Sequence, residues 1–266
     1  MIKKTINGVT FLEFELFRDM KWLKHCFSTR IGGVSEGQFY SMNFRVKGDS
    51  LENVRENYKR ICEAASISFE ALTLSAQEHG TNIKLISQGD IGKGVHKERD
   101  YDNIDALITN ERGITLSTFH ADCAAVFLVD SENRAIGLVH AGWRGTVDKI
   151  SQVAIAEMAK AYGTKAENII AGVSASICGS CFEVDSPVYE LFKEFEEYRR
   201  GSEYRLGKYF IDLKNVNKKI LLNCGVKEEN IEISHLCTKC DDELFYSHRR
   251  DGDNRGSMAA FMEIKI

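Results

Sequence analysis

The residues best suited to chemistry lie in one stretch, between Phe119 and Thr146. Cys123 precedes an apolar run that ends at Val129, and a second apolar run leads to His140. A short polar turn joins the two runs, and this pattern predicts a pair of buried strands. If the strands form a hairpin, the thiol of Cys123 and the imidazole of His140 lie at the same end. That arrangement suits a metal site or a Cys–His catalytic pair, although a buried thiol and a hydrogen-bonded histidine would give the same pattern.

The stretch leads into a predicted helix over residues 146–162, which a glycine follows. Thr146 is a suitable N-cap for this helix, and its positive end would then lie near Gly145 and Arg144. We therefore expect a phosphate or another anion to bind close to His140. The apolar face of the helix recurs at helical spacing and consists of Val147, Ile150, Ala154 and Met158.

Strands and helices alternate along the rest of the chain. Residues 49–65 predict the clearest helix, because their apolar side chains recur at spacings of three and four. The order of the elements allows hairpins as well as crossovers. We therefore expect an α+β fold with mixed β-sheets rather than a doubly wound parallel sheet.

Four further cysteines form two short patterns. Cys178 and Cys181 are separated by two residues, a spacing that on its own is only a weak indication of zinc. Cys237 and Cys240 follow His235, and this segment could hold a second metal or redox site. Reduced thiols near a structured turn are the alternative, and the sequence leaves the roles of both segments open.

The composition excludes several classes of protein. The chain has 266 residues, 43% of them hydrophobic, which is enough for a substantial core. A formal net charge of −4 gives no reason to expect a nucleic-acid partner. No apolar run approaches the ~18 residues of a membrane span. We expect a cytoplasmic protein whose eight cysteines are reduced thiols or metal ligands.

Short motifs along most of the chain resemble those of one family. The matching segments are Phe27 to Arg30, Gly32 to Ser35, Gln77 to Gly80, Ala121 to Cys123, His140 to Gly145, Cys181 to Val184, Tyr246 to Gly252 and Met258 to Ala260. In this order they resemble the YfiH or laccase-domain family, whose members are often named polyphenol oxidase laccase or purine nucleoside phosphorylase. Several motifs in the same order are much more specific than any one of them.

The resemblance implies that His79, Cys123 and His140 bind zinc. These residues are far apart in the sequence, so their spacing alone would not establish a metal site. Two imidazoles and one thiolate suit zinc and leave a fourth tetrahedral position open, as in catalytic zinc sites. Copper is also possible. However, the seven histidines include no His-x-His pair of the kind that a multicopper oxidase needs.

The resemblance also singles out residues that would contact the substrate. It implies substrate-binding roles for Arg30 and Asn43, and Arg144 and Arg249 are the preferred candidates for binding an anion or the substrate. Asp122 and Arg144 are the expected catalytic residues. Asp122 would act as a proton carrier or as the hydrogen-bond partner of a metal-bound histidine.

The fold implied by the resemblance is an α/β/β/α-type sandwich that forms a single YfiH-like laccase domain over residues 1–266. The implied reactions are phosphorolysis of adenosine, inosine and methylthioadenosine, and deamination of adenosine. The partners would be a purine nucleoside and phosphate. Three alternatives stay open: an amide hydrolase with Cys123 as nucleophile and His140 as base, a copper-dependent polyphenol oxidase, and a non-catalytic zinc-binding protein.

The sequence departs from the family pattern at positions near these motifs. His120 and His248 stand where other residues are usual, and Ala124 and Ala125 replace a segment that usually contains proline. None of these changes removes an expected metal ligand. His120 and His248 could add ligand or proton-transfer capacity, so the preferred nucleoside does not follow from the sequence.

Overall fold

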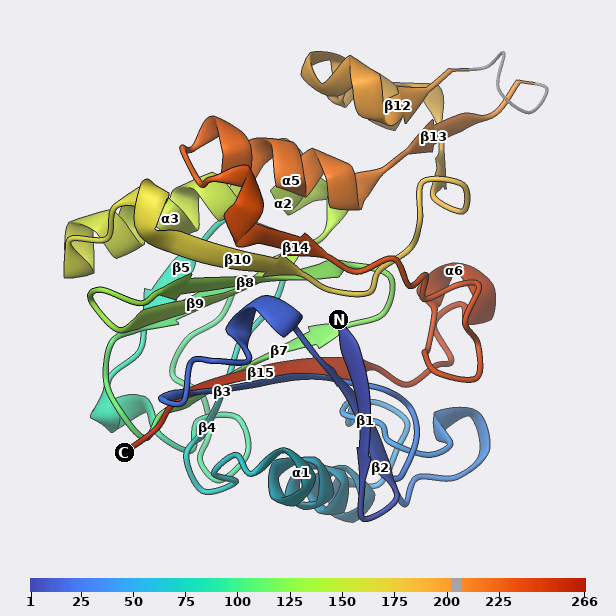
Figure 1. Ribbon diagram of the computed structural model, residues 1–266. Helices are drawn as coiled ribbons and strands as arrows, with labels where there is room; N and C mark the ends of the chain where they lie inside the picture. Colours follow the sequence, from blue (N-terminus) through green and yellow to red (C-terminus); the bar gives the residue numbers. More distant parts are fainter. Residues whose placement is uncertain (202–206) are drawn as a thin grey trace.

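The structure is a computed structural model that describes residues 1–201 and 207–266. Two six-stranded sheets stack face to face, with helices on the outer side of each (Figure 1). The first sheet has the order β1 (Ile2–Ile6), β2 (Val9–Glu13), β3 (Leu23–Ser28), β15 (Met258–Ile264), β7 (Thr115–His120) and β4 (Leu72–Leu74). The second has the order β14 (Ile231–Ile233), β10 (Ile169–Val173), β8 (Ala124–Asp130), β9 (Ala135–Ala141), β6 (Ala106–Thr109) and β5 (Ile83–Leu85).

Both large sheets mix parallel and antiparallel pairs, as the sequence predicted. The pairs β4–β7, β5–β6 and β10–β14 are parallel, and the other pairs in these sheets are antiparallel. A small third sheet contains β11 (Glu183–Val184), β13 (Tyr209–Ile211) and β12 (Arg199–Arg200). The helices are α1 (Leu51–Ala65), α2 (Trp143–Val147), α3 (Ile150–Tyr162), α4 (Ser186–Leu191), α5 (Leu213–Asn223) and α6 (His248–Asp251).

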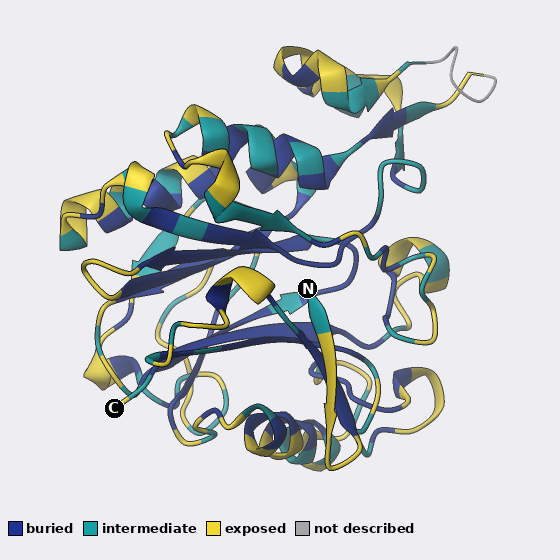
Figure 2. Cartoon of the chain, viewed as in Figure 1, coloured by how far each residue is buried: buried dark blue, intermediate teal, exposed yellow. Residues whose placement is uncertain are grey.

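The alternation of side chains along each strand explains the layers. On β8, Ala125, Phe127 and Val129 point into the core between the two sheets. The intervening residues of β8 point to the opposite face, where α3 covers them with Ala154 and Met158. On the far side of the molecule, α1 covers the outer face of the first sheet. Figure 2 shows the result, with buried strands in the middle and exposed residues along the outer helices. The α/β/β/α sandwich is therefore confirmed.

The central hairpin that the sequence predicted is also confirmed. β8 and β9 pair antiparallel, and Ala125 lies opposite His140. The turn between them is stabilised by Asp130, whose Oδ1 accepts the backbone N–H groups of Glu132 and Asn133 at 3.0 and 3.2 Å. Cys123 directly precedes β8, so the hairpin brings it to the end at which His140 lies.

The predicted helix over residues 146–162 is wrong at its start. The chain forms two helices here, α2 and α3, because Lys149 adopts a left-handed conformation with φ +57°. Thr146 lies inside α2 rather than capping it, and its Oγ1 accepts a hydrogen bond from Asn217 at 3.1 Å. Since α2 has only five residues, the expected anion site at the start of a long helix is not supported. None of the helices in the described part of the chain is long and apolar enough to cross a membrane.

Candidate active site

Three potential metal ligands converge at the end of the central hairpin. His79 comes from the turn that follows β4, Cys123 from the start of β8, and His140 from β9. Their ligand atoms all lie within 4.8 Å of one another. The distance from Cys123 Sγ to His79 Nε2 is 3.9 Å, and the two histidine rings are 4.9 Å apart. The structure thus brings together the three residues that the family motifs singled out.

Asp105, directly before β6, forms hydrogen bonds that hold His79 and His140 in place. Its buried carboxylate accepts a hydrogen bond from Nδ1 of His140 at 2.7 Å. It also accepts the backbone N–H groups of Glu78, His79 and Gly80 at 2.9 to 3.0 Å. The bond to Nδ1 leaves Nε2 of His140 available as a metal ligand. Sequence reasoning missed Asp105, and the only signal for it was an acidic residue directly before a buried strand.

Gly142 leaves just enough room for the three ligands. A Cβ atom built at this position would lie 2.8 Å from Cδ2 of His79 and 3.1 Å from Sγ of Cys123. The backbone φ of Gly142 is −71°, which any residue can adopt. Glycine is therefore needed here for space and not for backbone freedom.

The electrostatics of the site favour a charged thiolate. Burial alone would raise the pKa of Cys123, but the neighbouring His140 and His79 lower it to about 6. Burial alone would lower the pKa of His140, but Cys123 and Asp105 raise it to about 9. Both shifts favour a thiolate on Cys123 and a protonated imidazole on His140. A thiolate is the form of cysteine that binds metals and also the form that acts as a nucleophile.

The donor set fits a metal ion such as zinc. One thiolate and two imidazoles are ligands that zinc prefers, and they would leave a coordination position free. The hydrogen bond from His140 to Asp105 is the orienting contact that metal-bound histidines usually have. His120 is buried next to this group, but its Nδ1 faces the backbone oxygen of Cys123 and its Nε2 faces Thr118. His248 is exposed, with Asp253 at 3.7 Å.

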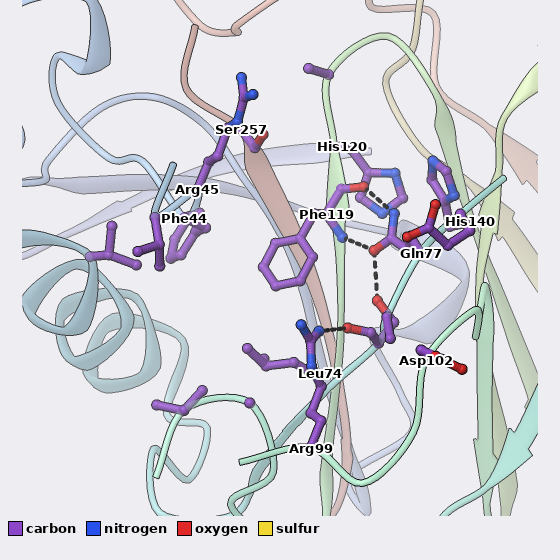
Figure 3. A pocket seen from close by; sticks show the side chains of 18 of the residues that line it. Phe44, Arg45, Leu74, Gln77, Arg99, Asp102, Phe119, His120, His140 and Ser257 are labelled. Carbon is purple, nitrogen blue, oxygen red and sulfur yellow. Dashed lines mark hydrogen bonds between the residues drawn. The ribbon is translucent and has the colours of Figure 1, made fainter. Parts of the chain in front are cut away.

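A cavity of about 660 Å³ opens beside the three ligands. Figure 3 shows Phe44 and Arg45 on one side of it and His120 and His140 on the other. Gln77 fixes the nearby turn, because its side chain bonds both the N–H and the C=O of Phe119 at 2.7 and 2.8 Å. The apolar and aromatic residues of the lining include Phe44, Leu51, Val54, Tyr58, Leu74, Tyr101 and Phe119. A cavity of this size and lining suits a small ligand with a flat apolar part.

Four arginines line the same cavity, namely Arg45, Arg55, Arg99 and Arg255. None of them forms an ion pair with a carboxylate in the part of the chain that the structure describes. Arg45 donates to the carbonyl oxygen of Asp253 at 2.6 Å, and Arg255 donates to that of Gly256 at 3.0 Å. The buried Nε of Arg255 has no hydrogen-bond partner among the described residues. These side chains supply positive charge that an anionic ligand would balance.

Two of the expected substrate-binding residues have structural contacts instead. Arg30 donates to the carbonyl oxygens of Tyr40 and Asp242, and neither it nor Asn43 lines the cavity. Asn43 is fully buried, and its Oδ1 accepts the backbone N–H groups of Arg45 and Ser257. Asn43 therefore positions two residues of the cavity wall. Substrate binding by Arg30 or Asn43 stays a prediction.

Asp122 is held in place by three hydrogen bonds. Its two carboxylate oxygens accept hydrogen bonds from Oγ1 of Thr238 at 2.6 Å, from Oγ of Ser247 at 3.1 Å and from the backbone N–H of Arg249 at 2.7 Å. Asp105 rather than Asp122 is the hydrogen-bond partner of a potential metal-binding histidine. Asp122 is not among the residues that line the cavity, and its role as proton carrier stays a prediction.

Arg144 and Arg249 lie away from the large cavity. The guanidinium of Arg144 is exposed and stacks over the ring of Trp143 at 4.1 Å. Arg249 donates to the carbonyl oxygen of Glu183 at 2.6 Å. Trp143 and Arg249 both line a second, smaller hollow of about 410 Å³. Binding of an anion by Arg144 or Arg249 stays a prediction.

The fold and the converging cysteine and histidines are those expected for a YfiH-like enzyme. A family model described as multi-copper polyphenol oxidoreductase laccase matches residues 24–265. The chain belongs to this laccase-domain family of enzymes.

Similar proteins carry the names of two related activities. A purine nucleoside phosphorylase of Bacteroides thetaiotaomicron is 35% identical over 258 residues, which are 95% of this chain and 96% of the relative. Adenosine deaminase RL5, from an unknown prokaryotic organism, is 32% identical over 236 residues, which are 86% of this chain and 90% of the relative. The crystal structure of the hypothetical protein YfiH of Bacillus licheniformis matches with a TM-score of 0.90 and 26% identity, covering 98% of this chain and 97% of the other.

Proposed function

We propose that this chain is a zinc-dependent purine nucleoside enzyme that acts as a single domain over residues 1–266. It cleaves adenosine, inosine and methylthioadenosine with phosphate, giving the free base and ribose 1-phosphate or its methylthio derivative, and it also deaminates adenosine. The observation that carries this proposal is one cavity that joins a set of metal ligands to arginines without acidic partners. Names of the relatives support the same reaction class.

The residues of the cavity have separate tasks in this proposal. Arg45 and Arg255 bind phosphate, since guanidinium groups form paired hydrogen bonds with phosphate oxygens. Phe44 and Phe119 contact the flat purine ring. Asp105 holds the imidazole of His140 in the orientation that metal binding needs. A zinc ion held by the cysteine and the two histidines supplies Lewis-acid chemistry at its free position.

Phosphorolysis requires these groups to place two reactants in line. A phosphate oxygen forms a bond to the anomeric carbon of ribose while the bond from that carbon to the purine nitrogen breaks. The departing base takes up a proton. Glu78 and Asp102 line the cavity, and their carboxyl groups are the candidates for delivering this proton. Holding the phosphate and the nucleoside together lowers the entropic part of the barrier.

Product analysis after incubation with adenosine tests the proposal. With phosphate present, we expect ribose 1-phosphate in an amount equal to the sum of adenine and hypoxanthine. Inosine formed without phosphate would demonstrate deamination. If neither product forms from adenosine, and inosine and methylthioadenosine are also unchanged, the proposed function is wrong.

An amide hydrolase is the second candidate, because Cys123 and His140 lie close together and their pKa shifts favour a thiolate beside an imidazolium. Alkylation with iodoacetamide separates the two candidates. A thiolate bound to zinc loses much of its nucleophilicity, so Cys123 should react slowly with metal present and faster after chelation. Activity that survives complete removal of metal, but not alkylation of Cys123, would favour the hydrolase.

The cytoplasmic location stays a prediction in either case.

A further inference from the structure

The two Cys-x-x-Cys segments meet in space, outside the candidate active site. Cys178 and Cys181 follow β10, and Cys237 and Cys240 follow β14. The two strands are parallel neighbours, so the segments that follow them leave the same edge of the sheet. All four sulfur atoms lie within 4.8 Å of one another. Each segment alone was a weak indication, but the fold combines them into one four-cysteine cluster.

The geometry of the cluster matches a metal site better than a pair of disulfides. Four sulfurs around a tetrahedral zinc ion, each at ~2.3 Å from it, lie ~3.8 Å from one another. The Sγ atoms of Cys181 and Cys240 are 3.4 Å apart, close to that value and far beyond the ~2.05 Å of a disulfide bond. The backbone N–H groups of Cys178 and Cys240 both point at Sγ of Cys237, the first at 3.3 Å. Such donors stabilise a thiolate.

The surrounding charge also favours thiolates. Lys214, on α5, is only 6% exposed, and its Nζ donates to the carbonyl oxygen of Leu236 at 2.8 Å. It forms no ion pair with a carboxylate among residues 1–201 and 207–266. Burial lowers the pKa of Lys214, and the nearby carboxylate of Asp212 offsets this effect in part. Thiolates of Cys178 and Cys237 would add further negative charge near this ammonium, whereas neutral thiols would not.

We propose that Cys178, Cys181, Cys237 and Cys240 form a second metal centre, in which four thiolates bind one structural zinc ion. Four protein ligands leave no free coordination position, so this centre stabilises the fold and does not act on substrate. His235 is exposed and lies outside the cluster. The cysteines themselves complete the ligand set.

The second centre also supports the segment that carries the candidate ligand Cys123. Thr238 lies between two of the proposed ligands, and its hydroxyl donates to Asp122 at 2.6 Å. Asp122 directly precedes the candidate ligand Cys123 and has an unfavourable backbone φ of +83°. A zinc ion that fixes Thr238 would therefore help to hold this conformation.

Zinc content per chain, measured by elemental analysis after purification with reductant, tests the proposal. We expect two equivalents in the wild type and in Cys224→Ser, a control that changes a cysteine outside both clusters. Cys240→Ser, which alters the exposed member of the cluster, should lose one equivalent. Two equivalents retained in Cys240→Ser, and also in Cys178→Ser, would overturn the proposal.

X-ray absorption tests the proposal on a variant that keeps all four cysteines of the cluster. The Cys123→Ser variant should hold zinc only at the second centre. Its zinc K-edge X-ray absorption should then show four sulfur ligands at ~2.3 Å. Zinc coordinated by nitrogen or oxygen, or no zinc at all, would contradict the proposal. Mass spectrometry that finds disulfides among these four cysteines in the freshly purified wild type would also contradict it.

Discussion

Asp105 accepts a hydrogen bond from Nδ1 of His140 at 2.7 Å, and both groups are almost completely buried. The same carboxylate holds the backbone of the turn that carries His79. One residue thus fixes two of the three candidate metal ligands, although it contacts neither the cavity nor the metal position.

Replacing Asp105 by asparagine should weaken metal binding. The amide cannot accept all the hydrogen bonds of the carboxylate, so we expect the zinc affinity of the active-site group to fall about 10- to 100-fold. Competition with a chelator measures that affinity. Asp130→Asn is the matched control, because Asp130 is equally buried but stabilises only the β8–β9 turn. Equal zinc affinities in the two variants would show that Asp105 does not orient the ligands.

Replacing Arg255 by alanine should raise the KM for phosphate more than the KM for the nucleoside. We expect the KM for phosphate to rise at least about 10-fold, or ~1.4 kcal/mol of binding free energy, with a smaller change in the KM for adenosine. Arg144→Ala is the comparison, since Arg144 is exposed and lies outside the large cavity. A larger effect in Arg144→Ala would move the phosphate site to the smaller hollow beside Trp143.

Replacing Gly142 by alanine should expel the active-site metal by steric conflict alone. The new methyl group would lie 2.8 Å from His79 and 3.1 Å from Cys123, so the ligands would have to separate. Zinc content should fall by one equivalent, while circular dichroism stays that of a folded protein. Gly89→Ala is the control, because the nearest atom to its added Cβ would be 3.8 Å away. Full zinc content in Gly142→Ala would mean that the ligands are placed differently.

His25 should make the stability of the protein depend on pH. Burial, with a smaller effect of Lys4, lowers its pKa from 6.5 to about 3, and its Nε2 accepts the N–H of Phe14. The unfolded chain binds a proton below pH 6.5 that the folded chain does not bind until about pH 3. The contribution of His25 to the free energy of unfolding is therefore fully present above pH 6.5. It falls by about 1.4 kcal/mol per pH unit as the pH drops from there towards about 3.

The His25→Gln variant isolates this effect, since an amide oxygen can accept the same hydrogen bond but does not titrate. Urea unfolding should show that the stability advantage of the wild type shrinks as the pH falls from about 6 to about 4. A difference that stays constant over this range would show that His25 is protonated in the folded protein.

The sequence predicted the parts of the fold that depend on local patterns. The β8–β9 hairpin follows from two apolar runs and a polar turn, and these signals lie within one short segment. Asp105 and Arg255 could not be found in this way. Asp105 reaches His140 because β6 pairs with β9, and Arg255 reaches the cavity because β15 lies in the middle of the first sheet. Such contacts depend on the pairing of distant strands.

The four-cysteine cluster illustrates the same limit. Each Cys-x-x-Cys segment is visible in the sequence, but only the parallel pairing of β10 with β14 places them together. The left-handed residue Lys149 is a different case, because lysine gives no local signal for the break between α2 and α3.

The most direct test of the proposed function measures zinc content and phosphorolysis of adenosine on the same samples. Wild type and Cys224→Ser should hold two equivalents of zinc and should be equally active. Cys123→Ser should hold one equivalent and lose at least about 100-fold in kcat/KM, which corresponds to ~2.7 kcal/mol of barrier. If Cys123→Ser lost its active-site zinc and still cleaved adenosine at the wild-type rate, the metal centre of His79, Cys123 and His140 would not be the site of the reaction.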